Sequence, residues 1–128
     1  MAELEVAVVA VDGMVWEGQA KSVVVKTVEG DIGLLPGHEP VLAILADAPV
    51  RVIQADGKTR VFAVHGGFFS MDTNKVSILA ESAESAKQID LENAKQAKAD
   101  AEAGDMEDPK NRAALRTAET KIRVATGE

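Results

Sequence analysis

The chain has 128 residues, a formal net charge of −7 and no cysteine, with 46% hydrophobic and 27% charged residues. This length allows one compact domain, or a small domain with an appendage. The lack of cysteine excludes disulfides and thiolate chemistry, and the acidic balance argues against nucleic acid, whose phosphates need a basic surface. Apolar stretches are far shorter than the ~20 residues of a membrane helix. Because the sequence also shows no signal or transit peptide, we expect a protein on the cytoplasmic side.

The first eighty residues have the pattern of short strands separated by turns. Asp56-Gly57 between two alternating runs is the strongest hairpin signal, because this dipeptide favours a tight turn. Strands this short and frequent are typical of an all-β sandwich or barrel. The predicted strands cover residues 4–11, 22–28, 32–35, 41–46, 50–55, 59–65, 68–71 and 76–80.

After residue 81 the chain becomes rich in Ala, Lys, Glu and Gln, which are good helix formers. Asp90 is the expected N-cap of a first helix, and Gly104 is expected to end it in a left-handed conformation. Asp108-Pro109 predicts the start of a second helix, because proline at the first helical position loses no hydrogen bond. That helix should continue to about residue 125.

The faces that these helices would turn toward each other consist mostly of alanine. Each buried methyl group contributes only about 0.8 kcal/mol, so we expect a loosely held hairpin that can dock, undock or extend. The chain is therefore predicted to form an all-β N-terminal sandwich over residues 1–84 and a C-terminal antiparallel α-helical hairpin over residues 85–128. The predicted inner residues are Ala94, Ala97, Ala101, Ala114, Ala118, Ile122 and Ala125.

No group of residues has the pattern of a catalytic or metal site. Gly57-Lys58-Thr59 resembles the end of a phosphate-binding loop, but Val52 stands where that motif needs its first glycine. His38 and His65 are the only histidines, and we expect structural or interface roles for both. No serine lies in a nucleophile-elbow pattern. The sequence therefore predicts a non-enzymatic subunit or adaptor without a cofactor.

The end of the chain is basic although the whole is acidic. Residues 109–128 hold two acids and five bases, whereas residues 81–108 hold nine acids and three bases. Arg112, Arg116 and Arg123 share one helical face, at positions i, i+4 and i+11. An ordinary solvated face and a docking surface for an acidic protein partner both remain open.

Four segments, in order and at matching spacing, resemble the epsilon subunit family of bacterial F-type ATP synthases. The most specific is residues 29–40, Glu-Gly-Asp-Ile-Gly-Leu-Leu-Pro-Gly-His-Glu-Pro, which is similar to the family's acidic-Gly loop and Leu-Pro-Gly-His-x-Pro turn. The resemblance covers nearly the full chain and is strongest over residues 4–84. The other segments are Gly66-Gly67-Phe68, the strand of residues 76–81 and Ile89-Asp90.

The resemblance implies a flattened sandwich of about ten strands with a C-terminal helical hairpin, in a non-catalytic subunit of the central stalk. Such a subunit binds the gamma subunit and the ring of c subunits, and it couples proton-driven rotation to ATP synthesis. It would lie peripherally on the cytoplasmic face of the bacterial cell membrane. Glu29, Gly30, Asp31 and His38 match the family's stretches nearest the rotor junction.

The resemblance also implies that the hairpin meets the alpha and beta subunits through basic residues, here Arg112, Arg116 and Arg123, and so regulates ATP hydrolysis. Members that bind ATP in the hairpin show Ile-Asp-x-x-Arg-Ala. Ile89 and Asp90 match this motif, but Asn93 stands in place of the arginine. Losing the guanidinium removes a charge-assisted contact and argues against ATP sensing. The alternatives are a free-standing nucleotide-sensing β-sandwich protein and a small β-fold enzyme.

Overall fold

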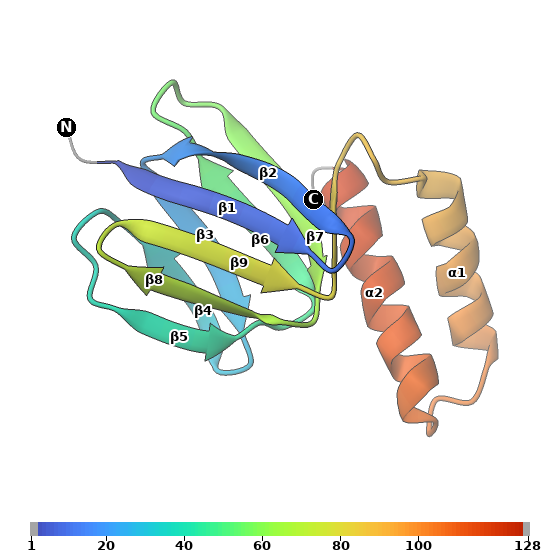
Figure 1. Ribbon diagram of the computed structural model, residues 1–128. Helices are drawn as coiled ribbons and strands as arrows, with labels where there is room; N and C mark the ends of the chain where they lie inside the picture. Colours follow the sequence, from blue (N-terminus) through green and yellow to red (C-terminus); the bar gives the residue numbers. More distant parts are fainter. Residues whose placement is uncertain (1–2, 127–128) are drawn as a thin grey trace.

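A computed structural model describes residues 3–126, which form a β-sandwich followed by two helices (Figure 1). This architecture confirms the predicted fold class. The elements, in chain order, are β1 (Leu4–Ala10), β2 (Gly13–Ala20), β3 (Ser22–Thr27), β4 (Gly30–Leu34), β5 (Val41–Ile44), β6 (Ala48–Ile53), β7 (Thr59–His65), β8 (Phe68–Asp72), β9 (Lys75–Ala80), β10 (Ser82–Ser85), α1 (Leu91–Ala103) and α2 (Pro109–Thr126).

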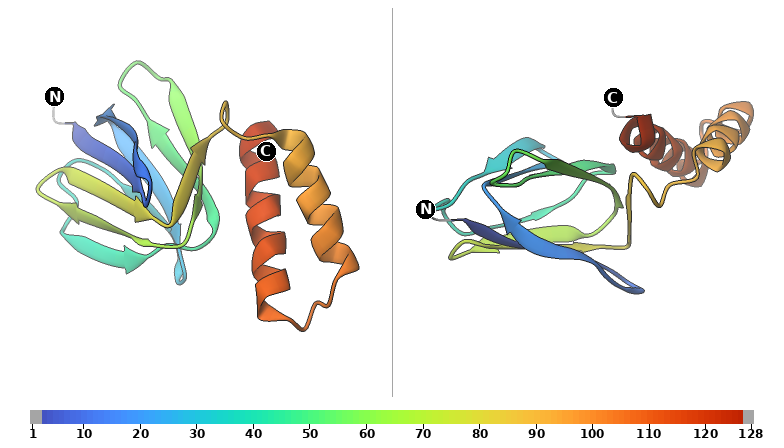
Figure 2. Two further views of the ribbon diagram at one scale, coloured as in Figure 1. Left: turned by 45° about the vertical axis from the view of Figure 1, so that its right-hand side comes forward. Right: turned by 90° about the horizontal axis from the view of Figure 1, so that it is seen from above.

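The strands form two five-stranded sheets that pack face to face (Figure 2, right). Sheet A has the order β2-β1-β9-β8-β5, and sheet B has the order β10-β7-β6-β3-β4. All neighbouring strands are antiparallel except β1 and β9, which pair in parallel from Glu5 opposite Lys75 to Ala10 opposite Ala80. This one parallel pair joins the first and the last strand of sheet A in chain order.

Alternate side chains of both sheets point inward and form one apolar core. In β1, Leu4, Val6 and Val8 are fully buried while Glu5 between them is exposed. Most of the core is aliphatic, and fully burying such a side chain contributes about 1.5–3 kcal/mol. At one edge the Trp16 ring lies 6.0 Å from the ring of Phe62. The sandwich thus has a continuous core of its own.

Two strands of the sandwich were not predicted from residue patterns, although the family resemblance implied about ten. β2 contains two glycines and a glutamate, which are poor strand formers. It forms because it pairs along the whole of β1 after the Asp12-Gly13 turn. β10 has only four residues, and it forms because it pairs with β7 from His65 opposite Ser82 to Phe62 opposite Ser85.

The helix starts agree with the sequence prediction, but the predicted conformation of Gly104 is wrong. The Asp90 carboxylate accepts a hydrogen bond from the Asn93 amide at 3.1 Å and caps α1. Gly104 is extended, with φ −89° and ψ −171°, instead of left-handed. The side-chain amide of Asn111 donates to the Ala101 carbonyl oxygen at 2.8 Å. Because α2 supplies this cap, the end of α1 needs no left-handed residue.

The seam between the helices is narrower than predicted. Ala94, Ala101 and Ala118 are buried, whereas Ala97 and Ala114 are exposed. These two line a groove of about 590 Å³ between the helices. The buried seam between α1 and α2 therefore consists of small alanine side chains, each of which contributes little.

Candidate interaction surfaces

The outer face of sheet A carries a row of exposed or half-buried apolar side chains, which we call the apolar belt. The register places Ile44 opposite Phe68, Phe68 opposite Leu79, and Leu79 opposite Val9. Ile44 and Phe68 have 63% and 43% of their surfaces exposed. Exposed apolar patches of this kind mark binding sites more often than chance. The belt consists of Ile44, Phe68, Leu79, Val9 and Met14, one from each strand of the sheet.

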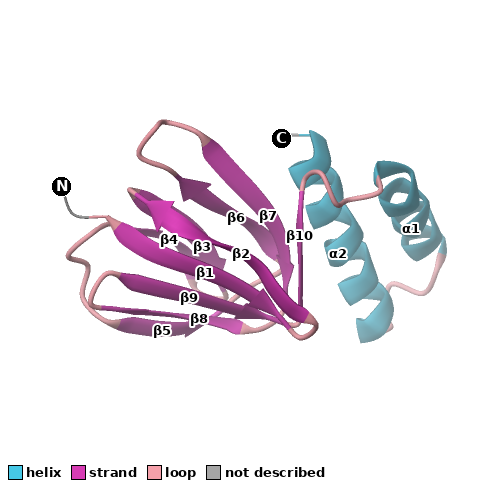
Figure 3. Cartoon of the chain, turned by 45° about the horizontal axis from the view of Figure 1, so that its top comes forward, coloured by secondary structure: helices cyan, strands magenta, loops and turns pink. Residues whose placement is uncertain are grey.

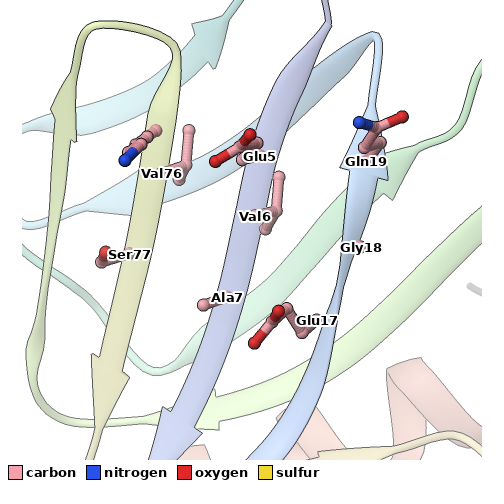
Figure 4. Close-up of a pocket in the computed structure, with 9 residues that line it drawn as sticks. Glu5, Val6, Ala7, Glu17, Gly18, Gln19, Val76 and Ser77 are labelled. Atoms are coloured by element: carbon pink, nitrogen blue, oxygen red, sulfur yellow. The ribbon is translucent and has the colours of Figure 1, made fainter.

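Next to the belt, the side chains on the same face are first short and then polar. Ala7 and Ser77 lie opposite each other on β1 and β9. Figure 4 shows them in a depression of about 390 Å³ that Glu5 and Glu17 flank. The outer face of sheet A is therefore apolar along the belt, is lined by short side chains in the depression, and carries charged side chains at its edge.

The structure separates the residues predicted at the rotor junction into two groups. Glu29, Gly30 and Asp31 form the tip of the β3–β4 hairpin, where the Thr27 hydroxyl donates to the Gly30 carbonyl oxygen at 2.9 Å. This tip adjoins the belt, because the Val28 amide donates to the carbonyl oxygen of Ile44 at 3.3 Å.

His38 lies at the opposite end of β5, in the loop that leads into Val41 (Figure 1). Its neighbour Gly37 donates its amide to the side-chain oxygen of Asn74 at 2.8 Å, which ties this loop to the β8–β9 turn. His38 is therefore not part of the surface that the tip and the belt share.

α2 packs on β7 and β6 of sheet B, beside the end of the sandwich that carries β10 (Figure 3). Asp47, between β5 and β6, accepts two hydrogen bonds from α2. The Asp47 carboxylate accepts hydrogen bonds from the Gly66 amide at 3.1 Å and from the Thr117 hydroxyl at 3.2 Å. The Asp47 carbonyl oxygen accepts a third from the Thr120 hydroxyl at 3.3 Å. Asp47 thus joins the sandwich to the hairpin.

His65, at the end of β7, is buried beneath α2. Its Nδ1 lies 3.8 Å from a carboxylate oxygen of Asp47, and neither ring nitrogen has a hydrogen-bond partner. Burial lowers the pKa of His65, while the nearby Asp47 carboxylate opposes that shift. An ion pair of 3.0 Å between Lys121 and Glu84 lies beside it, one-third exposed on each partner. Exposure makes this ion pair a weak contribution to docking.

The three predicted docking arginines do not share one environment. Arg112 and Arg116 are exposed on the first half of α2, which projects beyond the sandwich (Figure 2, left). Arg112 also donates to the carbonyl oxygen of Met106 at 3.3 Å in the loop between the helices. Arg123 lies near the sandwich, beside Arg51 of β6. Arg112 and Arg116 therefore lie on the part of α2 that is distant from the sandwich, whereas Arg123 does not.

The residues matched to the nucleotide motif are engaged locally. The Asp90 carboxylate caps α1, as described above, and it lines the groove between the helices together with Glu84 and Asp100. Lys121 is the one basic residue among those lining this groove. Nucleotide phosphates would meet mostly negative charge there.

The part of the chain that the structure describes has neither a metal-binding cluster nor a membrane-spanning helix. Residues 3–126 contain no group of three or more His, Asp or Glu side chains placed to hold a metal ion. Within the same range, no helix combines the length and the apolar character needed to cross a membrane.

Sequence reasoning missed the apolar belt and the role of Asp47. The alternation of Leu42 and Ile44 with the more buried Ala43 could have indicated an exposed apolar edge on β5. Asp47, in a short turn between two strands, gave no signal, because its partners Thr117 and Thr120 lie 70 and 73 residues away.

Comparison with known proteins agrees with this architecture. The family model for the ATP synthase delta/epsilon chain β-sandwich domain matches residues 3–86. The ATP synthase epsilon chain of Streptomyces coelicolor is 45% identical over 130 residues, which cover 98% of each chain. That of Rhodococcus jostii is 53% identical over 96 residues, covering 74% of this chain and 79% of the relative.

Solved structures give the same result. A chain in the OSCP/F1/c-ring structure of the Euglena gracilis mitochondrial ATP synthase superposes with a TM-score of 0.84 at 25% identity, covering 98% of this chain and 82% of that one. A chain of the Tetrahymena thermophila mitochondrial ATP synthase shares the fold, with a TM-score of 0.62 at 16% identity over 98% and 96% of the two chains. By its sequence and its fold, this chain belongs to the ATP synthase epsilon chain family.

Proposed function

We propose that this chain is a non-catalytic subunit of the central stalk, which attaches to the gamma subunit and the c-ring through the outer face of sheet A. In this role it turns with the rotor and couples proton-driven rotation to ATP synthesis performed on other subunits. The main support for this proposal is the apolar belt, which crosses all five strands of the sheet and exposes four of its five side chains to solvent. The similarity to a chain in the OSCP/F1/c-ring structure of the Euglena ATP synthase supports this assignment.

The belt and the β3–β4 tip have the composition of a protein–protein interface. Such interfaces have an apolar centre and a polar rim. Ile44 and Phe68 would supply the centre, and Glu29 and Asp31 the rim beside it. Because His38 lies at the other end of β5, we assign it to a second, separate contact with the rotor.

The non-catalytic assignment is supported by the position of the buried histidine. Its ring lies beneath α2 and beside a carboxylate that already holds Thr117 and Gly66. A substrate could not reach this pair without removing the helix. The chemistry would therefore take place on other subunits.

We further propose that residues 1–84 bind the rotor and that residues 85–128 are regulatory. The few contacts between hairpin and sandwich allow the hairpin to leave, and the projecting Arg112 and Arg116 then meet acidic surfaces of the alpha and beta subunits. The subunit is peripheral, on the cytoplasmic face of the cell membrane. ATP binding at Ile89 and Asp90 forms no part of the proposal, because acidic side chains line the neighbouring groove.

Substitution in the belt tests the proposal. Ile44→Asp combined with Phe68→Asp should weaken binding to the isolated gamma subunit by at least about tenfold, since truncating or charging a buried interface centre costs about 2 kcal/mol or more. The matched control is Met106→Asp, an exposed apolar residue in the loop between the helices. Binding would be measured by calorimetry, with circular dichroism to confirm the fold. Belt variants that fold and bind gamma like the wild type would refute this surface.

A further inference from the structure

The interface between the hairpin and the sandwich closes over His65, which is buried, and Asp47, which is half-buried. We propose that Asp47 and His65, covered by Thr117 and Thr120 of α2, form a proton-sensitive latch, in which protonation of His65 releases the hairpin from the sandwich. The latch is a property of the isolated chain, so it does not depend on the proposed rotor contact.

Few contacts hold the hairpin in place, so a change of one charge can matter. α2 packs on β7 and β6, and its polar contacts with the sandwich include the hydrogen bonds from Thr117 and Thr120 to Asp47 and the part-exposed ion pair between Lys121 and Glu84. Val124, buried on the same side of α2, adds an apolar contact. A net hydrogen bond contributes about 1 kcal/mol, so the docked state rests on a small margin.

The docked geometry suits a neutral imidazole and does not suit a cation. His65 is 7% exposed, and both of its ring nitrogens lack a hydrogen-bond partner. The closest carboxylate oxygen of Asp47, at 3.8 Å, already accepts the Gly66 amide, and the other accepts the Thr117 hydroxyl. A charge buried without a hydrogen bond is expensive, because it loses its hydration without replacement.

Charged groups around His65 also affect its pKa. Asp47, before β6, and Glu84, on β10, favour the protonated ring, whereas Lys121, on α2, disfavours it. Glu81, on the chain that leaves β9, extends over the neighbouring Gly66. Burial outweighs these charges, and the pKa of His65 is lowered in the docked state.

The sign of the pH effect follows from this comparison. Once the hairpin leaves, water reaches the ring, and the pKa of His65 returns toward its ordinary value of about 6.5. The open state then binds the proton more tightly than the docked state. Docking is therefore fully favourable above that ordinary pKa and weakens as the pH falls through it toward the lower docked pKa.

The distance between hairpin and sandwich tests the latch directly. Because the chain has no cysteine, Lys58→Cys and Glu102→Cys provide two labelling sites for energy transfer, one on each part. Between pH 8 and pH 5.5 the ratio of docked to open molecules should fall, by at most about tenfold per pH unit, since one proton is linked. Trp16 emission, which reports the sandwich core, should not change over this range.

Two histidine variants separate the latch from other effects of acid. His65→Gln should remove the pH dependence of the distance, whereas His38→Gln, in an exposed loop, should keep it. A distance that does not change with pH in the wild type would overturn the proposal, and so would the same response in His65→Gln. Tighter docking in acid would also overturn it, since it would show that the proton completes an ion pair with Asp47.

A measurement on the unsubstituted ring covers the case in which His65→Gln fails to fold. Nuclear magnetic resonance follows the ring protons of both histidines through the titration. Proton uptake by His65 should coincide with hairpin release. Uptake by His65 while the hairpin stays docked would overturn the latch.

Discussion

The Thr117 hydroxyl donates to the Asp47 carboxylate at 3.2 Å, across 70 residues of sequence. The other oxygen of that carboxylate accepts the Gly66 amide at the corner between β7 and β8. One side chain thus holds a corner of the sandwich and the hairpin together. Substituting Asp47 would disturb both, so the attachment of the hairpin is better tested from the helix.

Thr117→Val removes the hydroxyl at nearly constant volume and should weaken hairpin docking by about 1 kcal/mol, the usual net value of one hydrogen bond. Hydrogen exchange of the β7 amides beneath α2 measures this, as exchange about fivefold faster. The control is Thr126→Val, whose hydroxyl bonds only to the Ile122 carbonyl oxygen of the same helix. Equal exchange rates in both variants would mean that Asp47 does not anchor α2.

Gly67→Ala should destabilise the sandwich by at least about 2 kcal/mol, because φ is +95° and an added methyl would clash with the Leu79 carbonyl oxygen. Urea unfolding followed by Trp16 emission measures the loss. Gly33→Ala, in β4, is the matched control, since a methyl there meets nothing within 4 Å. A Gly67→Ala protein as stable as Gly33→Ala would show that this corner can relax.

Asn111→Ala should destabilise the end of α1 by about 1 kcal/mol. The side-chain amide of Asn111 caps the Ala101 carbonyl oxygen at 2.8 Å and contacts that of Asp105 at 3.1 Å. Hydrogen exchange in the last turn of α1 should accelerate. Asn93→Ala serves as the control, because only the backbone amide of Asn93 takes part in the α1 N-cap. Unchanged exchange in Asn111→Ala would mean that water can replace Asn111 as the hydrogen-bond donor to the Ala101 carbonyl oxygen.

The sequence predicted best what depends on neighbouring residues. The β6–β7 hairpin and the Asp90 and Asp108 caps are local, and turn chemistry and capping determine them. The Asp108 carboxylate accepts the Lys110 amide at 3.0 Å, as the Asp-Pro pair indicated. β2 and β10 have weak local propensity, so their formation depends on partner strands that single-sequence patterns do not show.

The candidate surfaces depend on contacts between distant residues. Leu79 meets Val9 in the apolar belt only because β9 pairs in parallel with β1. The end of α1 likewise depends on another element, because Asn111 of α2 caps it in place of the predicted left-handed Gly104. Residue patterns identified the strands and the basic helix face, but they could not identify which faces stay open.

Reversing the charge of the two projecting arginines tests the proposed regulation. If the hairpin restrains ATP hydrolysis by docking on acidic surfaces, Arg112→Glu combined with Arg116→Glu should raise hydrolysis by the assembled complex, roughly two- to tenfold, because exposed ion pairs contribute up to about 1 kcal/mol each. Salt should reduce the difference between wild type and variant, since it screens such pairs. Lys95→Glu combined with Lys98→Glu makes the same charge change on α1 and should have a smaller effect. If both pairs of substitutions raise hydrolysis equally, net charge and not the α2 arginines controls the restraint.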